Sequence, residues 1–284
     1  LLFTFCPVGA AAGATVSLPD ILYKAMDGGQ YAVPPAQEVA QAEELFLDLL
    51  QGKGDTRAAW QDLGWVYEER TINGRQAVLL QEQENQKTGR GFYVFFKDGQ
   101  DHALMVPHGF KDLRTNTIGA YFLAEGQFRC GAFNTRPRWI KEGDKKINQD
   151  LAREKQSYFI AFTKAFARYA RQGTIFQIHG FARQKRISVN GVIADLILSA
   201  GHENPHDDVP ILAGCLGRVL RGAAKVYPHD IKELGATVNI SGKVLRAMNY
   251  EGFIHVEMVR PIREALSQDQ QLREKYLECI ANLE

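Results

Sequence analysis

His108 and His179 share a local sequence that could bind a metal ion. Each histidine follows an apolar run of strand length, and each is followed by Gly-Phe, whose glycine would let the backbone turn sharply beside an ion. A third apolar run, residues 252–258, carries Glu257 next to its end. In open α/β sheets, ligands bind at the carboxyl ends of the strands, because the loops and the amino ends of helices converge there. We therefore expect the two imidazoles and the carboxylate to lie close together.

Zinc is the metal ion that these residue types favour. A catalytic zinc site takes three nitrogen or oxygen ligands from the protein and leaves one position open, and two histidines with one carboxylate are a common set. Asp112 lies four residues after His108, so both side chains can face one point if a helical turn begins there. We expect His108, Asp112 and His179 to bind Zn2+. The alternative for Asp112 is to cap the helix that runs toward Ala124.

Glu257 is the candidate general base. A carboxylate within reach of a water at the metal can take its proton, and the end of the third run places this side chain well for that role. The open alternative is an ion pair with Arg260 or Arg263, which follow closely in the sequence. His255 shares the strand face of Glu257, and we expect it mainly to pack there.

Asn134-Thr135-Arg136 is a candidate grip for the substrate. The planar guanidinium of an arginine is the best bidentate partner for a carboxylate. The alternative is a surface arginine beside Arg138 and Trp139. We expect a peptide or small-molecule substrate that carries a free carboxylate.

Strands and helices alternate from about residue 102 onward. The expected strands are 103–106, 174–178, 192–198 and 252–258, and the expected helices are 150–171, 211–220 and 261–283. The strand runs are almost continuously apolar, which is typical of strands covered on both faces. The pattern predicts one α/β domain over residues 101–284 with a mostly parallel or mixed central sheet.

The first hundred residues show a different pattern. Residues 36–51 place apolar side chains on one helical stripe. Residues 76–81 and 91–96 are apolar or aromatic runs separated by a polar loop, as in a hairpin. We expect residues 15–100 to pack on the main domain as a lid or an added sheet edge.

Residues 1–14 resemble the remnant of an export signal. An apolar stretch is followed by Ala11-Ala12-Gly13-Ala14, small residues in the arrangement that signal peptidase accepts. The stretch is too short to span a bilayer, and no membrane span is expected. A buried apolar strand or an Ala/Gly-rich loop is the alternative. The first interpretation predicts an exported, periplasmic or secreted protein.

Charge and cysteine content argue against several other classes. The chain has 34 Lys and Arg against 33 Asp and Glu and no extended basic block, so nucleic acid is not an expected partner. The four cysteines have neither zinc-knuckle spacing nor the density of a disulfide-stapled mini-domain. Ser199 lies outside any nucleophile-elbow frame.

The motifs, taken in order, resemble those of the N-formylglutamate amidohydrolase family, which is itself similar to the zinc carboxypeptidases. They are Pro107-His108-Gly109 with Asp112 and Thr115, Asn134-Thr135-Arg136, Ile178-His179-Gly180, and His255-Val256-Glu257-Met258-Val259-Arg260. The resemblance covers roughly residues 102–266. It implies a phosphorylase/hydrolase-like, three-layer α/β sandwich that carries one zinc ion.

The resemblance also implies roles for individual residues. The zinc ligands would be His108, Asp112 and His179, the acid/base would be Glu257, and the substrate grip would be Asn134 with Arg136 or Arg260. The chain departs from zinc carboxypeptidases at Lys111, where they place an acidic ligand, and at Thr135, which separates an Asn and an Arg that they place side by side.

These observations predict a zinc-dependent hydrolase of an amide or peptide C–N bond. Two alternatives stay open. One is a non-catalytic binding domain of the same fold that has lost the metal. The other is a metal-independent esterase, which would need a histidine close to Ser199 or to a cysteine.

Overall fold

The computed structural model describes residues 16–283. The expected export signal at residues 1–14 lies outside the described residues and stays a prediction. Within residues 16–283, no helix is both long enough and apolar enough to cross a membrane.

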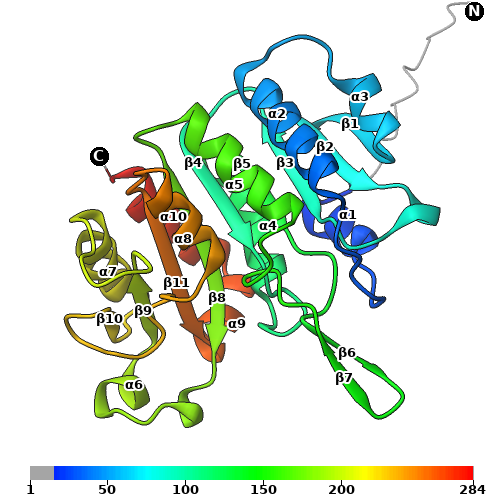
Figure 1. The fold of residues 1–284 in the computed structure, drawn as a ribbon. Helices are drawn as coiled ribbons and strands as arrows, with labels where there is room; N and C mark the ends of the chain where they lie inside the picture. The colour runs from blue at the N-terminus through cyan, green and yellow to red at the C-terminus, as the bar shows by residue number, and fades with distance from the viewer. Residues whose placement is uncertain (1–15, 284) are drawn as a thin grey trace, which may run out of the picture.

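One mixed sheet organises the described chain (Figure 1). Its nine strands lie in the order β1-β2-β3-β5-β4-β8-β11-β9-β10. They are β1 (Trp65–Ile72), β2 (Arg75–Glu82), β3 (Phe92–Phe96), β4 (Gln100–Val106), β5 (Phe128–Phe133), β8 (Thr174–Phe181), β9 (Leu196–Ser199), β10 (Ala224–Val226) and β11 (Phe253–Val259). The central strands β5, β4, β8 and β11 are parallel, β1–β3 are antiparallel, and β9 runs antiparallel to β11. A small hairpin, β6 (Trp139–Glu142) and β7 (Lys145–Asn148), stands apart from this sheet.

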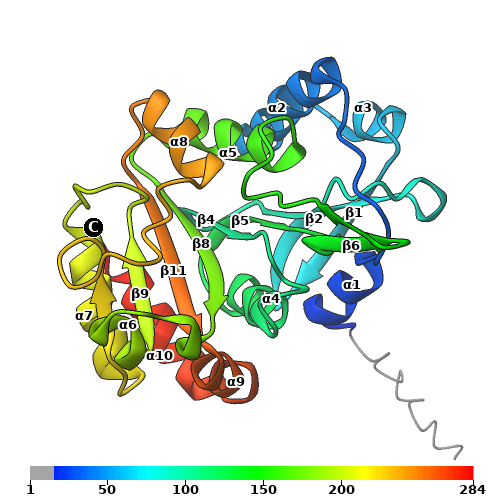
Figure 2. The ribbon, with the colours of Figure 1, turned by 60° about the horizontal axis from the view of Figure 1, so that its bottom comes forward.

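Helices cover both faces of the sheet, which confirms the predicted three-layer α/β architecture (Figure 2). One face packs against α2 (Ala36–Gln51), α3 (Arg57–Asp62), α5 (Tyr158–Tyr169) and α8 (Ile240–Ala247). The other face packs against α1 (Leu18–Ala25), α4 (Thr115–Glu125), α7 (Asp208–Val219), α9 (Arg260–Gln268) and α10 (Gln270–Ala281). A short helix, α6 (Val189–Ile193), precedes β9.

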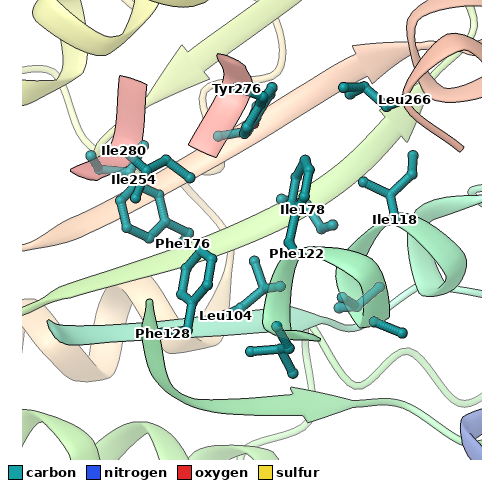
Figure 3. Close-up of a cluster of buried hydrophobic side chains, with 14 of the residues drawn as sticks. Leu104, Ile118, Phe122, Phe128, Phe176, Ile178, Ile254, Leu266, Tyr276 and Ile280 are labelled. Atoms are coloured by element: carbon teal, nitrogen blue, oxygen red, sulfur yellow. The ribbon is translucent and has the colours of Figure 1, made fainter. Parts of the chain in front are cut away.

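The core under α4 and α10 is built from aromatic and branched side chains (Figure 3). Phe122 of α4 stacks on Tyr276 of α10 with ring centroids 4.6 Å apart. Phe128 and Phe176 meet edge to face on the strands beneath, with centroids 5.9 Å apart. Full burial of a large apolar side chain stabilises a fold by about 1.5–3 kcal/mol. This core therefore stabilises the central strands, whose carboxyl ends carry the candidate site.

The amino-terminal section contributes strands to the same sheet. The helix predicted at 36–51 is confirmed as α2, and the predicted hairpin is confirmed as β2 paired antiparallel with β3. β1 adds one strand outside this pair, and β3 pairs with β5 on the inner side.

Three predicted elements need correction. The run 192–198 is not one strand, because Ser188 caps a helix that continues to Ile193 and the strand begins at Leu196. The helix predicted at 150–171 begins only at Tyr158, after Ser157 accepts a hydrogen bond from the Ile160 N–H. The helix predicted at 261–283 is broken into α9 and α10 at Asp269, which ends the first and caps the second.

A disulfide bond joins α7 to α10 through Cys215 and Cys279. The sequence spacing of the cysteines did not predict this bond. Disulfides persist mainly in oxidising compartments. The bond is therefore consistent with an exported protein, although the location itself stays a prediction.

Candidate metal centre

Parallel strands bring the two predicted histidines together. His108 follows β4 and His179 lies near the end of β8, its direct neighbour in the sheet. Their ring centroids lie 4.7 Å apart. Glu257 on β11 is the register partner of His179 on the other side of β8. The expectation that these three side chains meet at the carboxyl ends of neighbouring strands therefore agrees with the structure.

Asp112 faces both imidazoles. Its Oδ2 atom lies 3.6 Å from Nδ1 of His108 and 3.5 Å from Nδ1 of His179. Candidate ligand atoms of the three residues lie within 4.8 Å of one another. The side chain caps no helix: α4 begins after Arg114, and the Thr115 N–H donates to the backbone carbonyl of Asp112. The geometry thus favours the ligand interpretation over the cap.

Close packing requires a glycine after each histidine. A Cβ atom on Gly109 would lie 1.9 Å from the Asn116 side chain, and one on Gly180 would lie 2.5 Å from the Arg263 guanidinium. Only glycine allows these neighbours to approach the backbone beside the histidines.

Each histidine is held in place through its outer ring nitrogen. Nε2 of His108 lies 2.7 Å from Oδ1 of Asp150, whose other oxygen lies 2.6 Å from the Arg138 guanidinium. Nε2 of His179 lies 3.0 Å from Oε1 of Gln177. Histidines that bind metals typically donate their second N–H to such a carboxylate or carbonyl, which fixes the ring and makes the free nitrogen more basic. Both Nδ1 atoms are left directed at Asp112.

Sequence reasoning missed Asp150 and Gln177 as supporting residues. Asp150 was placed inside the helix predicted at 150–171, but it lies in the irregular segment before that helix. Gln177 lies on the same strand face as His179, two residues earlier, and that spacing is the one signal that could have identified it.

The electrostatics of the three residues suit a bound cation. Burial lowers the pKa of His108, but hydrogen bonds and charge from Asp112 and Asp150 outweigh it and raise the pKa to about 9. Burial would raise the pKa of Asp112, yet the two imidazoles hold it well below its usual range. Burial lowers the pKa of His179. The metal-free site therefore keeps a proton on His108 that a metal ion would displace.

Glu257 is buried, faces the cavity and has no ion-pair partner among the arginines that follow it. Arg260 pairs with Glu264 at 2.7 Å, and Arg263 donates to the backbone carbonyls of Met258 and Leu113. Burial, with a further contribution from the Asp112 charge, raises the pKa of Glu257 to about 8. A carboxyl group with a pKa near neutrality is suited to exchange protons.

The structure does not bring Asn134 and Arg136 into this cavity. The Asn134 side chain donates to the Pro107 carbonyl at 2.7 Å and accepts from the Arg136 N–H at 2.9 Å. The Arg136 guanidinium is buried, 2.8 Å from Oδ1 of Asp27, and it also donates to the Lys87 carbonyl. Asn134 thus supports the turn before His108, and Arg136 fastens the chain around Asp27.

A cavity of about 1130 Å³ opens over the candidate ligands. Its titratable lining is strongly cationic. The cations are Lys111, Arg138, Arg153, Arg183, Lys185, Arg186, Arg260 and Arg263, and the acids are Asp112, Asp150 and Glu257. Arg183, Arg186 and Arg260 pair with acids outside the lining, but the remaining excess of cations still attracts anionic groups. Arg260, which the resemblance implied as a substrate grip, lines the cavity. Arg153, which sequence reasoning missed, is 61% exposed and lies 3.8 Å from Asp150, so it is only loosely paired.

Comparisons with known proteins leave the family open. No protein-family model and no curated protein matches the chain. The resemblance to N-formylglutamate amidohydrolases therefore stays a prediction.

Solved structures match the chain only distantly. A proposed metallopeptidase of Shewanella amazonensis SB2B is 11% identical, with 84% of this chain and 91% of that chain covered and a TM-score of 0.36. A second, of Shewanella denitrificans OS217, is 12% identical, with 80% and 88% covered and a TM-score of 0.37. Bovine thrombin-activatable fibrinolysis inhibitor, solved with tick carboxypeptidase inhibitor, is 8% identical, with 89% and 99% covered and a TM-score of 0.39. Matches at this level carry no conclusion about activity, which has to be inferred from the residues of this chain.

Proposed function

We propose that this chain is a zinc-dependent hydrolase that cleaves an amide or peptide C–N bond. The observation that carries the proposal is the convergence of His108, Asp112 and His179, with both outer histidine nitrogens held, beside the buried carboxylate of Glu257, which accepts no hydrogen bond from the described residues. Two histidines and one carboxylate match the ligand set of catalytic zinc sites.

A zinc ion held by these three residues would supply a water of lowered pKa and polarise the substrate carbonyl. Glu257 performs the proton transfers. Its carboxylate, which lines the cavity, accepts the proton of the attacking water. The protonated carboxyl then donates that proton to the nitrogen of the leaving amine as the C–N bond breaks.

Cationic side chains around the cavity select the substrate. Arg153 is the best placed to bind a free carboxylate, because it is exposed and only loosely paired with Asp150. Arg138 pairs with the same oxygen of Asp150. Arg260 offers a second anchor in the cavity lining, although Glu264 already pairs with it. We expect acylated amino acids or peptides with a free carboxylate as substrates, with Arg153 in the role first predicted for Arg136.

The two alternatives receive less support. A binding domain that had lost its metal would pair Asp112 and Glu257 with arginines, and the described ion pairs include no such contact. An esterase would need a histidine hydrogen-bonded to Ser199, whose described hydrogen bond is instead with the Gly201 N–H.

A metal analysis combined with His179→Ala tests the proposal. Wild-type protein is expected to hold about one tightly bound zinc per chain and to hydrolyse N-acyl amino acids faster than their carboxamide analogues. His179→Ala is expected to lose both metal and activity, whereas His229→Gln, at an exposed histidine, keeps both. Hydrolysis that continues in His179→Ala, or in chelator-treated protein, would show that the reaction does not depend on this centre.

A further inference from the structure

A second set of potential metal ligands lies beside the first. Ligand atoms of His179, His255 and Glu257 lie within 4.8 Å of one another. His255 and Glu257 are two residues apart on β11, so they project from the same face of the sheet. The rings of His179 and His255 have centroids 4.5 Å apart.

His255 and Glu257 are buried without hydrogen-bond partners. They are 4% and 8% exposed, and both line the cavity. Nδ1 of His255 and Oε2 of Glu257 are enclosed with no partner within the described residues. Buried polar groups are almost always satisfied by protein, water or an ion, because an unsatisfied one costs about 1–3 kcal/mol. Nδ1 and Oε2 are enclosed, so an ion in the cavity would reach these side chains through Nε2 of His255 and Oε1 of Glu257.

The spacing fits a divalent cation. Nε2 of His255 lies 3.9 Å from Oε1 of Glu257. Two bonds to zinc, each of about 2.0–2.2 Å, span that gap. We infer that His255 and Glu257, next to His179, form a second divalent-cation site. This inference rests on the proposed function, because it assigns the first ion to His108, Asp112 and His179.

The second site binds its ion more weakly than the first. The outer nitrogens of His108 and His179 are held by Asp150 and Gln177, whereas Nδ1 of His255 has no such partner. Loss of an outer partner typically lowers metal affinity 10–100-fold. Repulsion from the first cation acts in the same direction. Filling is therefore sequential, and the second ion enters at higher metal concentration.

Occupancy of the second site opposes hydrolysis. A Glu257 carboxylate bound to a cation can no longer accept the proton of the attacking water. Because a general base contributes about 10²–10⁴-fold to a rate, filling the second site is expected to lower turnover by about 100-fold. The zinc dependence of activity should then rise to a maximum near one equivalent and fall beyond it.

The test is a zinc titration of the full chain after chelator treatment, followed by calorimetry and by hydrolysis of an N-acyl amino acid. Wild type is expected to take two equivalents, the second at least about tenfold weaker than the first. His255→Gln and Glu257→Gln are expected to keep the first equivalent and lose the second. His229→Gln, at an exposed histidine, is the matched control that keeps both.

Inhibition is read as the ratio of activity at one equivalent to activity at excess zinc within each protein. That ratio is expected to be about 100 for wild type and for His229→Gln, and close to one for His255→Gln. A single equivalent in wild type, or a second one unchanged in both variants, overturns the inference. If His255→Gln does not fold by circular dichroism, the Glu257→Gln titration decides.

The two proposals fail separately. Two equivalents that depend on His255, without hydrolysis of any amide, would leave the second site standing and remove the proposed function. One equivalent with zinc-dependent hydrolysis would do the reverse.

Discussion

Two buried glutamates of this chain lie in opposite surroundings. The Glu82 carboxylate, on β2, accepts hydrogen bonds from the backbone N–H groups of Thr88, Gly89 and Arg90, from the Thr88 hydroxyl and from the Arg90 guanidinium. Glu257, on β11, accepts none within the described residues and faces the cavity. Both carboxylates are therefore buried, and they differ in the number of hydrogen-bond donors around them.

This difference indicates which buried charge is structural. Around Glu82 every donor is a neighbour in sequence or a tightly paired arginine, and Arg90 also reaches Glu38 at 3.1 Å. Such a closed set rigidifies a fold. Around Glu257 the fold provides apolar neighbours and imidazoles and leaves the carboxylate free. A free buried carboxylate lowers stability, so its position at a cavity with metal-ligand geometry points to chemistry.

The same amide substitution at the two glutamates should separate activity from stability. Glu257→Gln is expected to lower kcat by at least about 100-fold, within the usual range for a general base, because the amide cannot accept a proton. The first zinc equivalent should be retained, and the melting temperature should rise or stay unchanged, because the amide buries no charge. Steady-state kinetics, metal analysis and a thermal melt on one preparation check this, and full activity would remove Glu257 from the reaction.

Glu82→Gln is expected to have the opposite effect. Breaking a buried ion pair by removing one partner costs about 3–5 kcal/mol, because the Arg90 charge stays buried. For a chain of this size the melting temperature should fall by roughly 10 °C, with kcat unchanged at temperatures where the protein is folded. A loss of activity without a loss of stability would mean that the closed cluster is coupled to the site.

Asp150→Asn sharpens the comparison at the metal centre. The asparagine can still accept from His108 but loses its charge and much of its hold on Arg138, so zinc affinity should fall by about 10–100-fold. Competition with a chelator of known affinity measures this change. If the variant binds zinc as tightly as wild type, the charge of Asp150 is not needed to hold His108.

The metal-free protein is expected to show a pH dependence of stability. His108, with its pKa raised to about 9, and Glu257, with its pKa raised to about 8, keep protons in the folded state that the unfolded chain has released above about pH 6.5. Each group should therefore lower the free energy of unfolding by up to about 1.4 kcal/mol per pH unit between pH 6.5 and 8. Urea titrations at several pH values measure this change. Glu257→Gln should roughly halve the decrease in the free energy of unfolding per pH unit, and a free energy of unfolding that increases with pH would contradict the assignment.

The sequence predicted the parts of the site that strands position. His108, His179 and Glu257 follow or end apolar runs, so the parallel order of β4, β8 and β11 was enough to bring them together. Asp112 followed from its four-residue spacing.

The parts that depend on irregular chain were not predictable in the same way. Asp150 and Arg153 lie in a segment without periodicity, and its approach to His108 is a tertiary fact. Arg136 looked free because its partner Asp27 is more than a hundred residues away in sequence. His255 was visible on the correct strand face, but only the surrounding contacts show that no described residue hydrogen-bonds its Nδ1 atom.

The bond between Cys215 and Cys279 closes a loop over a sequence separation of 64 residues, and β11 lies inside that loop. In the chain-entropy view, such a cross-link disfavours the unfolded chain by about 4 kcal/mol, mainly by restricting the enclosed segment. Because that effect lies in the unfolded chain, reduction of the bond should lower the stability of the whole fold, including the strand that bears His255 and Glu257.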